Sequence, residues 1–329
     1  MTKNDLPLVL ISHKLPVDWI TSLSGKCRLL ICAEASTNNI SELTRYINQA
    51  EGLFTLLTIK VDEDLLAGAT NLRVVSNMAA GVDNIDISAC SRRGIPVGNT
   101  PGVLTEGTAD LTFALLLSIA RNLPKASEDA KRGNWKTWSP TGWLGADLSG
   151  ATLGIIGMGK IGQAVARRAL GFGMQIIYMD TQPCNESEAS RLAIDELLIR
   201  SDFVSLHVPF TIETRDLINA EKLALMKSTA FLINTSRGQV VDLDALNTAL
   251  REGKIAGAAL DVTNPEPLPP DHPLYQVPNC LILPHIGSAT HHTRRRMAEL
   301  ACANLIAGLD GKQLPHCVNP EVYQSKQLP

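Results

Sequence analysis

The sequence has little net charge and few aromatic residues. Its 30 Lys and Arg residues nearly balance 33 Asp and Glu residues, which leaves a formal net charge of -3 and a pI near 6.2. Such a chain has no basic face on the scale that nucleic acids or anionic membranes favour, so we expect neither as a partner. Aromatic residues make up 4% of the 329 residues, but 45% are hydrophobic. This composition is typical of a globular protein with a large core, and the length suffices for two domains.

Long apolar runs are also missing. The longest mostly apolar run, residues 111–120, is too short to span a bilayer and lies between Asp110 and Arg121, which predicts a buried helix. Residues 1–5 lead directly into an apolar, strand-like stretch and show no signal-peptide pattern. We therefore expect no membrane association.

The seven cysteines form no recognisable ligand pattern. No two are spaced as Cys-x-x-Cys, and none has the paired spacing with histidine that a zinc site requires. We expect no metal and no disulfide framework. The pattern suits a reducing cytosol, so a cytoplasmic location is expected.

Strand patterns alternate with helix patterns in a first series up to residue 98. The strand patterns cover residues 8–11, 28–31, 53–57, 73–76 and 95–98, and the helix patterns cover 17–23, 41–50, 62–68 and 86–93. This alternation predicts a mainly parallel sheet with helices on both faces. The series has no glycine-rich dinucleotide turn, so we expect a separate domain.

The middle of the chain begins with a turn cluster at residues 99–102. A long apolar helix over 105–121 and a more polar helix ending near Gly133 follow. Residues 135–150 have the composition of an irregular loop and contain three of the four tryptophans. Two interpretations remain open: the tryptophans anchor the loop, or the loop is an arm that reaches a site or a partner subunit.

A second alternating series begins at residue 151. Its strand patterns cover residues 151–156, 175–179, 203–207, 230–234, 257–262 and 280–283, and its helix patterns cover 163–170, 195–200, 220–226 and 243–252. Beyond this series a single helix pattern covers residues 293–309. Together the two series predict an α/β fold with two doubly wound parallel sheets.

The second series contains a dinucleotide-binding pattern. Gly157, Gly159 and Gly162 fit G-x-G-x-x-G between a predicted strand and a predicted helix, where such a turn brings backbone close to a pyrophosphate. The helix N-terminus adds free amides and a favourable dipole. Asp180 ends the next strand, 23 residues after Gly157. An acid there accepts hydrogen bonds from the ribose hydroxyls of NAD and repels a 2′-phosphate.

Three polar clusters follow strands of the second series, at residues 234–238, 261–267 and 284–288. Because ligands of doubly wound sheets lie outside the carboxyl ends of the strands, Arg237, Glu266 and His285 are expected to converge. A guanidinium binds a carboxylate and polarises a ketone with paired donors. Histidine, with an unperturbed pKa of about 6.5, is a suitable proton donor, and a carboxylate fixes its tautomer.

Each of these residues also has a structural interpretation. His285 is also consistent with a core histidine whose hydrogen bonds are satisfied. Glu266 is consistent with a solvated acid in a proline-rich turn, and Arg237 is consistent with a structural ion pair with Asp242. The cluster at residues 291–296, with two histidines and three arginines, fits a solvated helix face better than a ligand site.

These motifs together resemble the D-isomer-specific 2-hydroxyacid dehydrogenase family over essentially the whole chain. The matching segments are 157–162, 234–238, 260–262, 265–267 and 284–288, and residues 261–269 and 283–290 are most similar to the branch of glyoxylate/hydroxypyruvate and 2-ketogluconate reductases. The resemblance implies two doubly wound domains with a cleft between them. The substrate domain would comprise residues 1–100 and 289–329, and the NAD-binding Rossmann domain, residues 101–288, would be inserted into it.

The resemblance also implies roles for individual residues. Arg237 would bind substrate and polarise its carbonyl, His285 would be the acid/base, and Glu266 would orient His285. Expected at the substrate are Leu57, the backbone amides of Ala80 and Gly81, and Trp143 of a neighbouring subunit in a homodimer. Expected along the cofactor are Thr108, Gly157, Gly159, Lys160, Ile161, Gly162, Asp180, Pro209, Thr214, Thr235, Ser236, Asp261 and Gly287.

The expected activity is NAD(P)H-dependent reduction of a small 2-oxo acid, glyoxylate or hydroxypyruvate, to the D-2-hydroxy acid. Asp180-Thr181-Gln182 includes no arginine for a 2′-phosphate, so NAD is favoured and NADP remains an alternative. Alternative activities for this chain are those of a 2-ketogluconate reductase or a 3-phosphoglycerate dehydrogenase. A non-enzymatic alternative is a dinucleotide-sensing interaction protein similar to the corepressors of the family.

Overall fold

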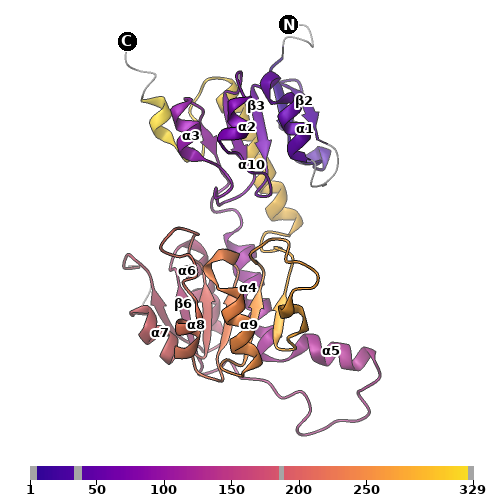
Figure 1. Cartoon of the computed structure of the whole chain (residues 1–329), viewed down its shortest axis with the longest axis vertical. Helices are drawn as coiled ribbons and strands as arrows, with labels where there is room; N and C mark the ends of the chain where they lie inside the picture. The colour runs from indigo at the N-terminus through magenta and orange to yellow at the C-terminus, as the bar shows by residue number, and fades with distance from the viewer. Residues whose placement is uncertain (1–5, 33–38, 185–188, 325–329) are drawn as a thin grey trace. The chain divides into compact units, whose positions relative to one another are not determined.

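The computed structural model describes residues 6–32, 39–184 and 189–324. Within it the chain forms two compact units, residues 1–104 with 290–329, and residues 105–289. Both units are built on a parallel sheet (Figure 1). Two parallel-sheet α/β units agree with the predicted fold class.

The first unit has a five-stranded sheet in the order β2-β1-β3-β4-β5. Its strands are β1 (Leu8–Ile11), β2 (Arg28–Ile31), β3 (Gly52–Thr55), β4 (Val74–Asn77) and β5 (Val97–Gly98). Its helices are α1 (Asn39–Tyr46), α2 (Glu63–Ala67), α3 (Ile87–Arg92) and α10 (His291–Leu309). Short 3-10 turns cover Val17–Trp19, Thr21–Leu23, Ile47–Gln49 and Pro320–Tyr323.

Apolar side chains cover both faces of the first sheet. Leu43, Leu65 and Ala89 of α1 to α3 belong to one buried cluster, which includes Leu10 and Val75 from the sheet. On the other face, α10 contributes a buried cluster with strand residues of β1, β3 and β4. Figure 1 shows α10 in gold against the indigo strands, so the C-terminal helix completes a unit that begins at the N-terminus.

The second unit has a seven-stranded sheet in the order β12-β11-β10-β9-β6-β7-β8, with every pair parallel. Its strands are β6 (Thr152–Ile156), β7 (Gln175–Met179), β8 (Ser190–Arg191), β9 (Phe203–Leu206), β10 (Phe231–Asn234), β11 (Gly257–Leu260) and β12 (Cys280–Ile282). Its helices are α4 (Thr105–Ala120), α5 (Leu123–Lys131), α6 (Lys160–Gly171), α7 (Ile194–Arg200), α8 (Ala220–Leu225) and α9 (Leu243–Arg251), with 3-10 turns at Gly238–Val240 and Pro273–Gln276. Two apolar clusters, one on each face, enclose this sheet.

Two sequence expectations differ from the structure. The helix predicted over residues 17–23 is a pair of 3-10 turns, because the amides of Trp19 and Ile20 bond to carbonyls three residues back and Ile20 leaves helical geometry. Strand β8, two residues long, was not expected.

Candidate active site

The glycine turn joins β6 to α6, and its three glycines meet different requirements. Gly157 has φ +96°, and a Cβ there would lie 2.7 Å from the His207 carbonyl oxygen. A Cβ at Gly162 would collide with the Gly157 carbonyl. Gly159 is the N-cap of α6, has no side-chain cap, and faces open space within 4 Å of the Cβ position. The turn therefore has the tight packing and the open backbone approach that a pyrophosphate requires.

Asp180 lies directly after β7 and is bonded to the glycine turn. Its Oδ2 accepts a hydrogen bond from the Met158 amide at 2.7 Å, and its Oδ1 accepts one from the Gln182 amide at 3.1 Å. The carboxylate thus lies at the carboxyl edge of the sheet, beside the place where a dinucleotide-binding turn holds its ligand.

Arg191 is a residue that sequence reasoning missed at this edge. It pairs in register with Tyr178, and its Nε and Nη2 donate to the backbone oxygens of Asp180 and Thr181, both at 2.9 Å. The sequence carries no arginine immediately after Asp180, but the unexpected strand β8 brings one there from 11 residues further on. Only the strand register reveals this placement.

His285 and Glu266 form a direct pair in the second unit. His285 Nδ1 lies 2.5 Å from Glu266 Oε1, and their side chains are 27% and 34% exposed. Strands β10, β11 and β12 are neighbours in the sheet, so the loops that carry Arg237, Glu266 and His285 leave adjacent strand ends. His285 itself has φ +52°, a left-handed conformation that costs free energy in a non-glycine residue and is enriched at functional sites.

Asp261 holds the loop that carries His285. Its backbone oxygen accepts from the His285 amide at 2.9 Å, while Oδ1 and Oδ2 accept from the amides of Ile286 and Gly287 at 2.7 and 2.8 Å. Burial raises the pKa of the Asp261 carboxyl, and the two amide donors oppose that shift. Asp261 was expected along the cofactor; here both of its carboxylate oxygens are bonded to the loop that carries His285.

Arg237 follows β10, in a turn built by Asn234. Asn234 Nδ2 donates to the Arg237 carbonyl oxygen at 2.8 Å, and Asn234 Oδ1 accepts from the amide and hydroxyl of Ser236. Arg237 Nη1 donates to the Ser236 carbonyl oxygen at 2.7 Å. Asp242, the alternative partner considered for Arg237, accepts the amides of Asp244 and Ala245 as the N-cap of α9.

The remaining expected cofactor residues fall into two groups in the second unit. Thr108 and Thr235 are buried: Thr108 Oγ1 donates to the Gly287 carbonyl at 3.4 Å, and Thr235 Oγ1 lies 3.0 Å from Thr112 Oγ1. These bonds join α4 to the loops after β10 and β12. Pro209 and Thr214 lie in the loop after β9, where Thr214 Oγ1 donates to the Pro209 carbonyl at 2.7 Å.

The expected substrate residues are divided between the units. Leu57, Ala80 and Gly81 belong to the first unit, in the loops that follow β3 and β4. Trp143 belongs to the second unit, where its indole nitrogen donates to Asp129 Oδ2 of α5 at 2.8 Å. Its ring lines a hollow of about 450 Å³ with Asn122, Lys125 and Leu144.

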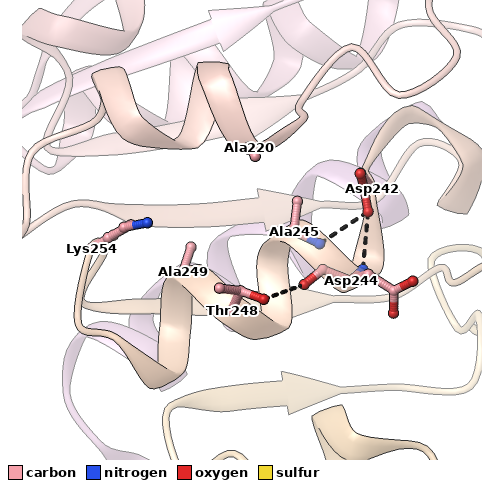
Figure 2. Close-up of a pocket in the computed structure, with 7 residues that line it drawn as sticks. All are labelled: Ala220, Asp242, Asp244, Ala245, Thr248, Ala249 and Lys254. Carbon is pink, nitrogen blue, oxygen red and sulfur yellow. Dashed lines mark hydrogen bonds between the residues drawn. The ribbon is translucent and has the colours of Figure 1, made fainter.

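A second surface hollow, of about 300 Å³, lies between α8 and α9 and includes none of the expected site residues (Figure 2). Its polar groups are engaged in helix structure: Asp242 caps α9, and Thr248 Oγ1 donates to the Asp244 carbonyl. It contains no histidine or cysteine, so we assign it no catalytic role.

Two features are absent from the described residues. No group of three or more His, Cys, Asp or Glu side chains among them has a metal-binding arrangement. None of their helices is long and apolar enough to cross a membrane.

Comparison with known proteins identifies the family. Residues 113–287 match the NAD-binding domain of D-isomer-specific 2-hydroxyacid dehydrogenases. The chain is 45% identical over 323 residues to a glyoxylate reductase of Korarchaeum cryptofilum, which covers 97% of each chain. This chain therefore belongs to the D-isomer-specific 2-hydroxyacid dehydrogenase family and is an NAD(P)-dependent dehydrogenase, as the motifs predicted.

Two solved structures extend the likeness to the whole fold. The TT0316 protein of Thermus thermophilus is 46% identical, with a TM-score of 0.90 over 94% of this chain and 99% of its own. An NADPH-dependent glyoxylate/hydroxypyruvate reductase of Sinorhizobium meliloti, in complex with NADP and malonate, is 33% identical, with a TM-score of 0.86 over 95% of this chain and 96% of its own.

Proposed function

We propose that this protein reduces a small 2-oxo acid, glyoxylate or hydroxypyruvate, to the corresponding 2-hydroxy acid of D configuration where that carbon is chiral. The observation that carries the proposal is the contact of 2.5 Å between His285 Nδ1 and Glu266 Oε1. The loops with Arg237, Glu266 and His285 follow three neighbouring strands, β10, β11 and β12. The similarity to glyoxylate reductases supports the choice of substrate.

Three side chains share the chemistry. The Arg237 guanidinium binds the substrate carboxylate and polarises the ketone oxygen through paired donors. His285 Nδ1–H donates a hydrogen bond to the Glu266 carboxylate, which leaves Nε2 as the atom that delivers a proton to the ketone oxygen. The reduced nicotinamide supplies the hydride to the carbonyl carbon when bound. The product is an alcohol, and in the oxidative direction His285 takes the proton back.

The cofactor would lie along the carboxyl edge of the second sheet. The glycine turn with Lys160 and Ile161 would hold the pyrophosphate, and Asp180 would bind the adenosine ribose and favour NAD over NADP. The remaining contacts would come from strand-end and α4 residues: Thr108, Pro209, Thr214, Thr235, Ser236 and Gly287. Asp261 would act through the His285 loop, given the bonds from the amides of Ile286 and Gly287.

The substrate carboxylate would also meet the amides of Ala80 and Gly81, with Leu57 nearby. We further propose a cytoplasmic homodimer in which Trp143 serves the partner's site. Trp135 and Trp138, 64% and 80% exposed in the same loop, favour an interface there. Light scattering tests the dimer: a mass near 35.5 kDa in solution would contradict it.

One assay tests the activity itself. NADH oxidation is followed with glyoxylate, hydroxypyruvate, 2-ketogluconate, pyruvate and 3-phosphohydroxypyruvate in parallel. We expect the highest kcat/KM with glyoxylate or hydroxypyruvate. The absence of NADH and NADPH oxidation with all five acids would overturn the proposed function.

A further inference from the structure

Three consecutive peptide groups in the loop after β4 are bound through their carbonyl oxygens. The Ala79 oxygen accepts from the Thr100 amide at 2.9 Å. The Ala80 oxygen accepts from Asn99 Nδ2 at 2.7 Å, and the Gly81 oxygen accepts from Asn77 Nδ2 at 3.0 Å. Side chains of two asparagines therefore determine the orientation of this loop.

The orientation of these carbonyls determines the direction of the amides that follow. In a trans peptide the C=O and N–H bonds point in opposite directions. Because the oxygens of Ala79, Ala80 and Gly81 are each bound by a donor, each of the amides of Ala80, Gly81 and Val82 points away from the donor that binds the oxygen of its own peptide group. Within the described part of the chain these three amides have no hydrogen-bond acceptor. Ala80, Gly81 and Val82 are half-buried, so these three backbone donors remain available to a ligand.

A third asparagine connects this loop to the loop after β3. Asn77 Nδ2 also donates to Asn84 Oδ1 at 3.1 Å. Asn84 Nδ2 in turn donates to the oxygens of Leu56 and Ile59 at 3.1 and 2.8 Å, on either side of Leu57. The pair formed by buried Asn77 and half-buried Asn84 thus holds both loops that carry the expected substrate residues of this unit.

Asn99 is itself anchored to the C-terminal helix. Asn304 of α10 is fully buried; its Nδ2 donates to the Asn99 carbonyl at 3.0 Å, and its Oδ1 accepts from the His316 amide at 3.1 Å. A Cβ at Gly98 would lie 2.6 Å from Asn304 Cγ, so this contact leaves no room for a side chain.

We propose that Asn77, Asn84 and Asn99, which we call the asparagine clamp, are positioning residues for carboxylate recognition. The clamp aims the amides of Ala80, Gly81 and Val82 at the substrate carboxylate without touching it. The asparagine side chains are neutral, so in this unit the negative charge of the substrate interacts with backbone N–H dipoles and not with a cationic side chain. The inference rests on the proposed function, because it takes the anion to be the carboxylate of the 2-oxo acid.

Asn99→Leu tests the clamp, since leucine has a similar shape and no donor. The matched control is Asn71→Leu: Asn71 Nδ2 also donates to a backbone oxygen, that of Asn48 at 2.7 Å, but on the exposed surface of the same unit. The readouts are KM and kcat for glyoxylate, Ki for oxalate, and Kd for NADH. Loss of one hydrogen bond is expected to raise KM and Ki together by about tenfold. The kcat and the Kd for NADH should change less than threefold, roughly the uncertainty of one weak contact.

An unchanged Ki for oxalate in Asn99→Leu would overturn the inference, as would a Ki that rises equally in Asn71→Leu. If the variant does not fold, amide hydrogen exchange of the wild-type protein with bound NADH, measured with and without oxalate, tests the inference instead. Oxalate should slow exchange of the amides of Ala80, Gly81 and Val82, and no slowing would overturn the clamp. The proposed function is tested separately, by whether the wild-type protein turns over any 2-oxo acid.

Discussion

The two units of this protein share one architecture but offer different chemistry at their strand ends. Both have a parallel sheet between two apolar clusters. The strand-end loops of the first unit present backbone amides held by neutral asparagines. Those of the second present a guanidinium, two carboxylates and an imidazole. A parallel sheet thus positions loops at its carboxyl edge, while the residues in those loops set the chemical groups that each unit offers.

The largest expected effect comes from removing the proposed proton donor of the second unit. His285→Ala should lower kcat/KM for glyoxylate by about a thousandfold, because proton delivery is lost. NADH binding should be retained, which fluorescence titration checks. His272→Asn is the matched control, since His272 only caps the 3-10 turn Pro273–Gln276 in the same unit. Full activity in His285→Ala would contradict the assignment.

The next effect concerns the stability of the second unit in acid. Burial lowers the pKa of His207 to about 3 from 6.5. Between these values the unfolded chain binds more protons at this residue, so the free energy of unfolding falls as pH falls. From pH 7 to pH 5 the wild-type protein should lose about 2 kcal/mol that His207→Gln does not lose.

Urea unfolding at both pH values measures this difference. His13→Gln is the control in the first unit: burial lowers the pKa of His13 as well, but His13 is only partly buried. The same loss of stability in wild-type and His207→Gln would show that His207 is not the acid-sensitive group.

A smaller effect tests how charge at Asp180 selects the cofactor. Asp180→Ala removes the carboxylate that would repel a 2′-phosphate and leaves the Arg191 guanidinium beside it. We expect the Kd for NADPH to fall about tenfold relative to that for NADH, equivalent to about 1.4 kcal/mol. Asp180→Ala combined with Arg191→Gln should lose this gain. Fluorescence titrations with both nucleotides measure the ratio, and an unchanged ratio would remove Asp180 as the selector.

The smallest effect concerns the charges of the first unit, which lie on its surface. Glu299 of α10 accepts hydrogen bonds from Arg295 and Arg296, and these side chains are 35–52% exposed. The two arginines lower the pKa of Glu299. Exposed pairs of this kind contribute little, so Glu299→Gln should cost about 0.5 kcal/mol in thermal unfolding and leave KM unchanged. A large loss of activity would show that charge matters in this unit too.

Local patterns predicted most elements and the order in which they occur. The strands β1, β2 and β7 have the expected bounds, because each is a short run rich in apolar residues with polar or turn residues close to its ends. The glycine turn was readable because its geometry depends on residues a few positions apart. Strand β8 and the broken segment 17–23 were not, since a two-residue strand and a 3-10 turn leave no periodic signal.

The sequence by itself determined two parallel-sheet units, a dinucleotide turn with an acid after the next strand, and the strand ends that carry Arg237, Glu266 and His285. Only the tertiary structure decided that Arg191 lies beside Asp180, that Asp261 holds the His285 loop, and that three asparagines orient the amides after β4. The reason is physical. Backbone conformation within an element depends on neighbouring residues, whereas these hydrogen bonds join residues that are distant along the chain and close only after the sheets have formed.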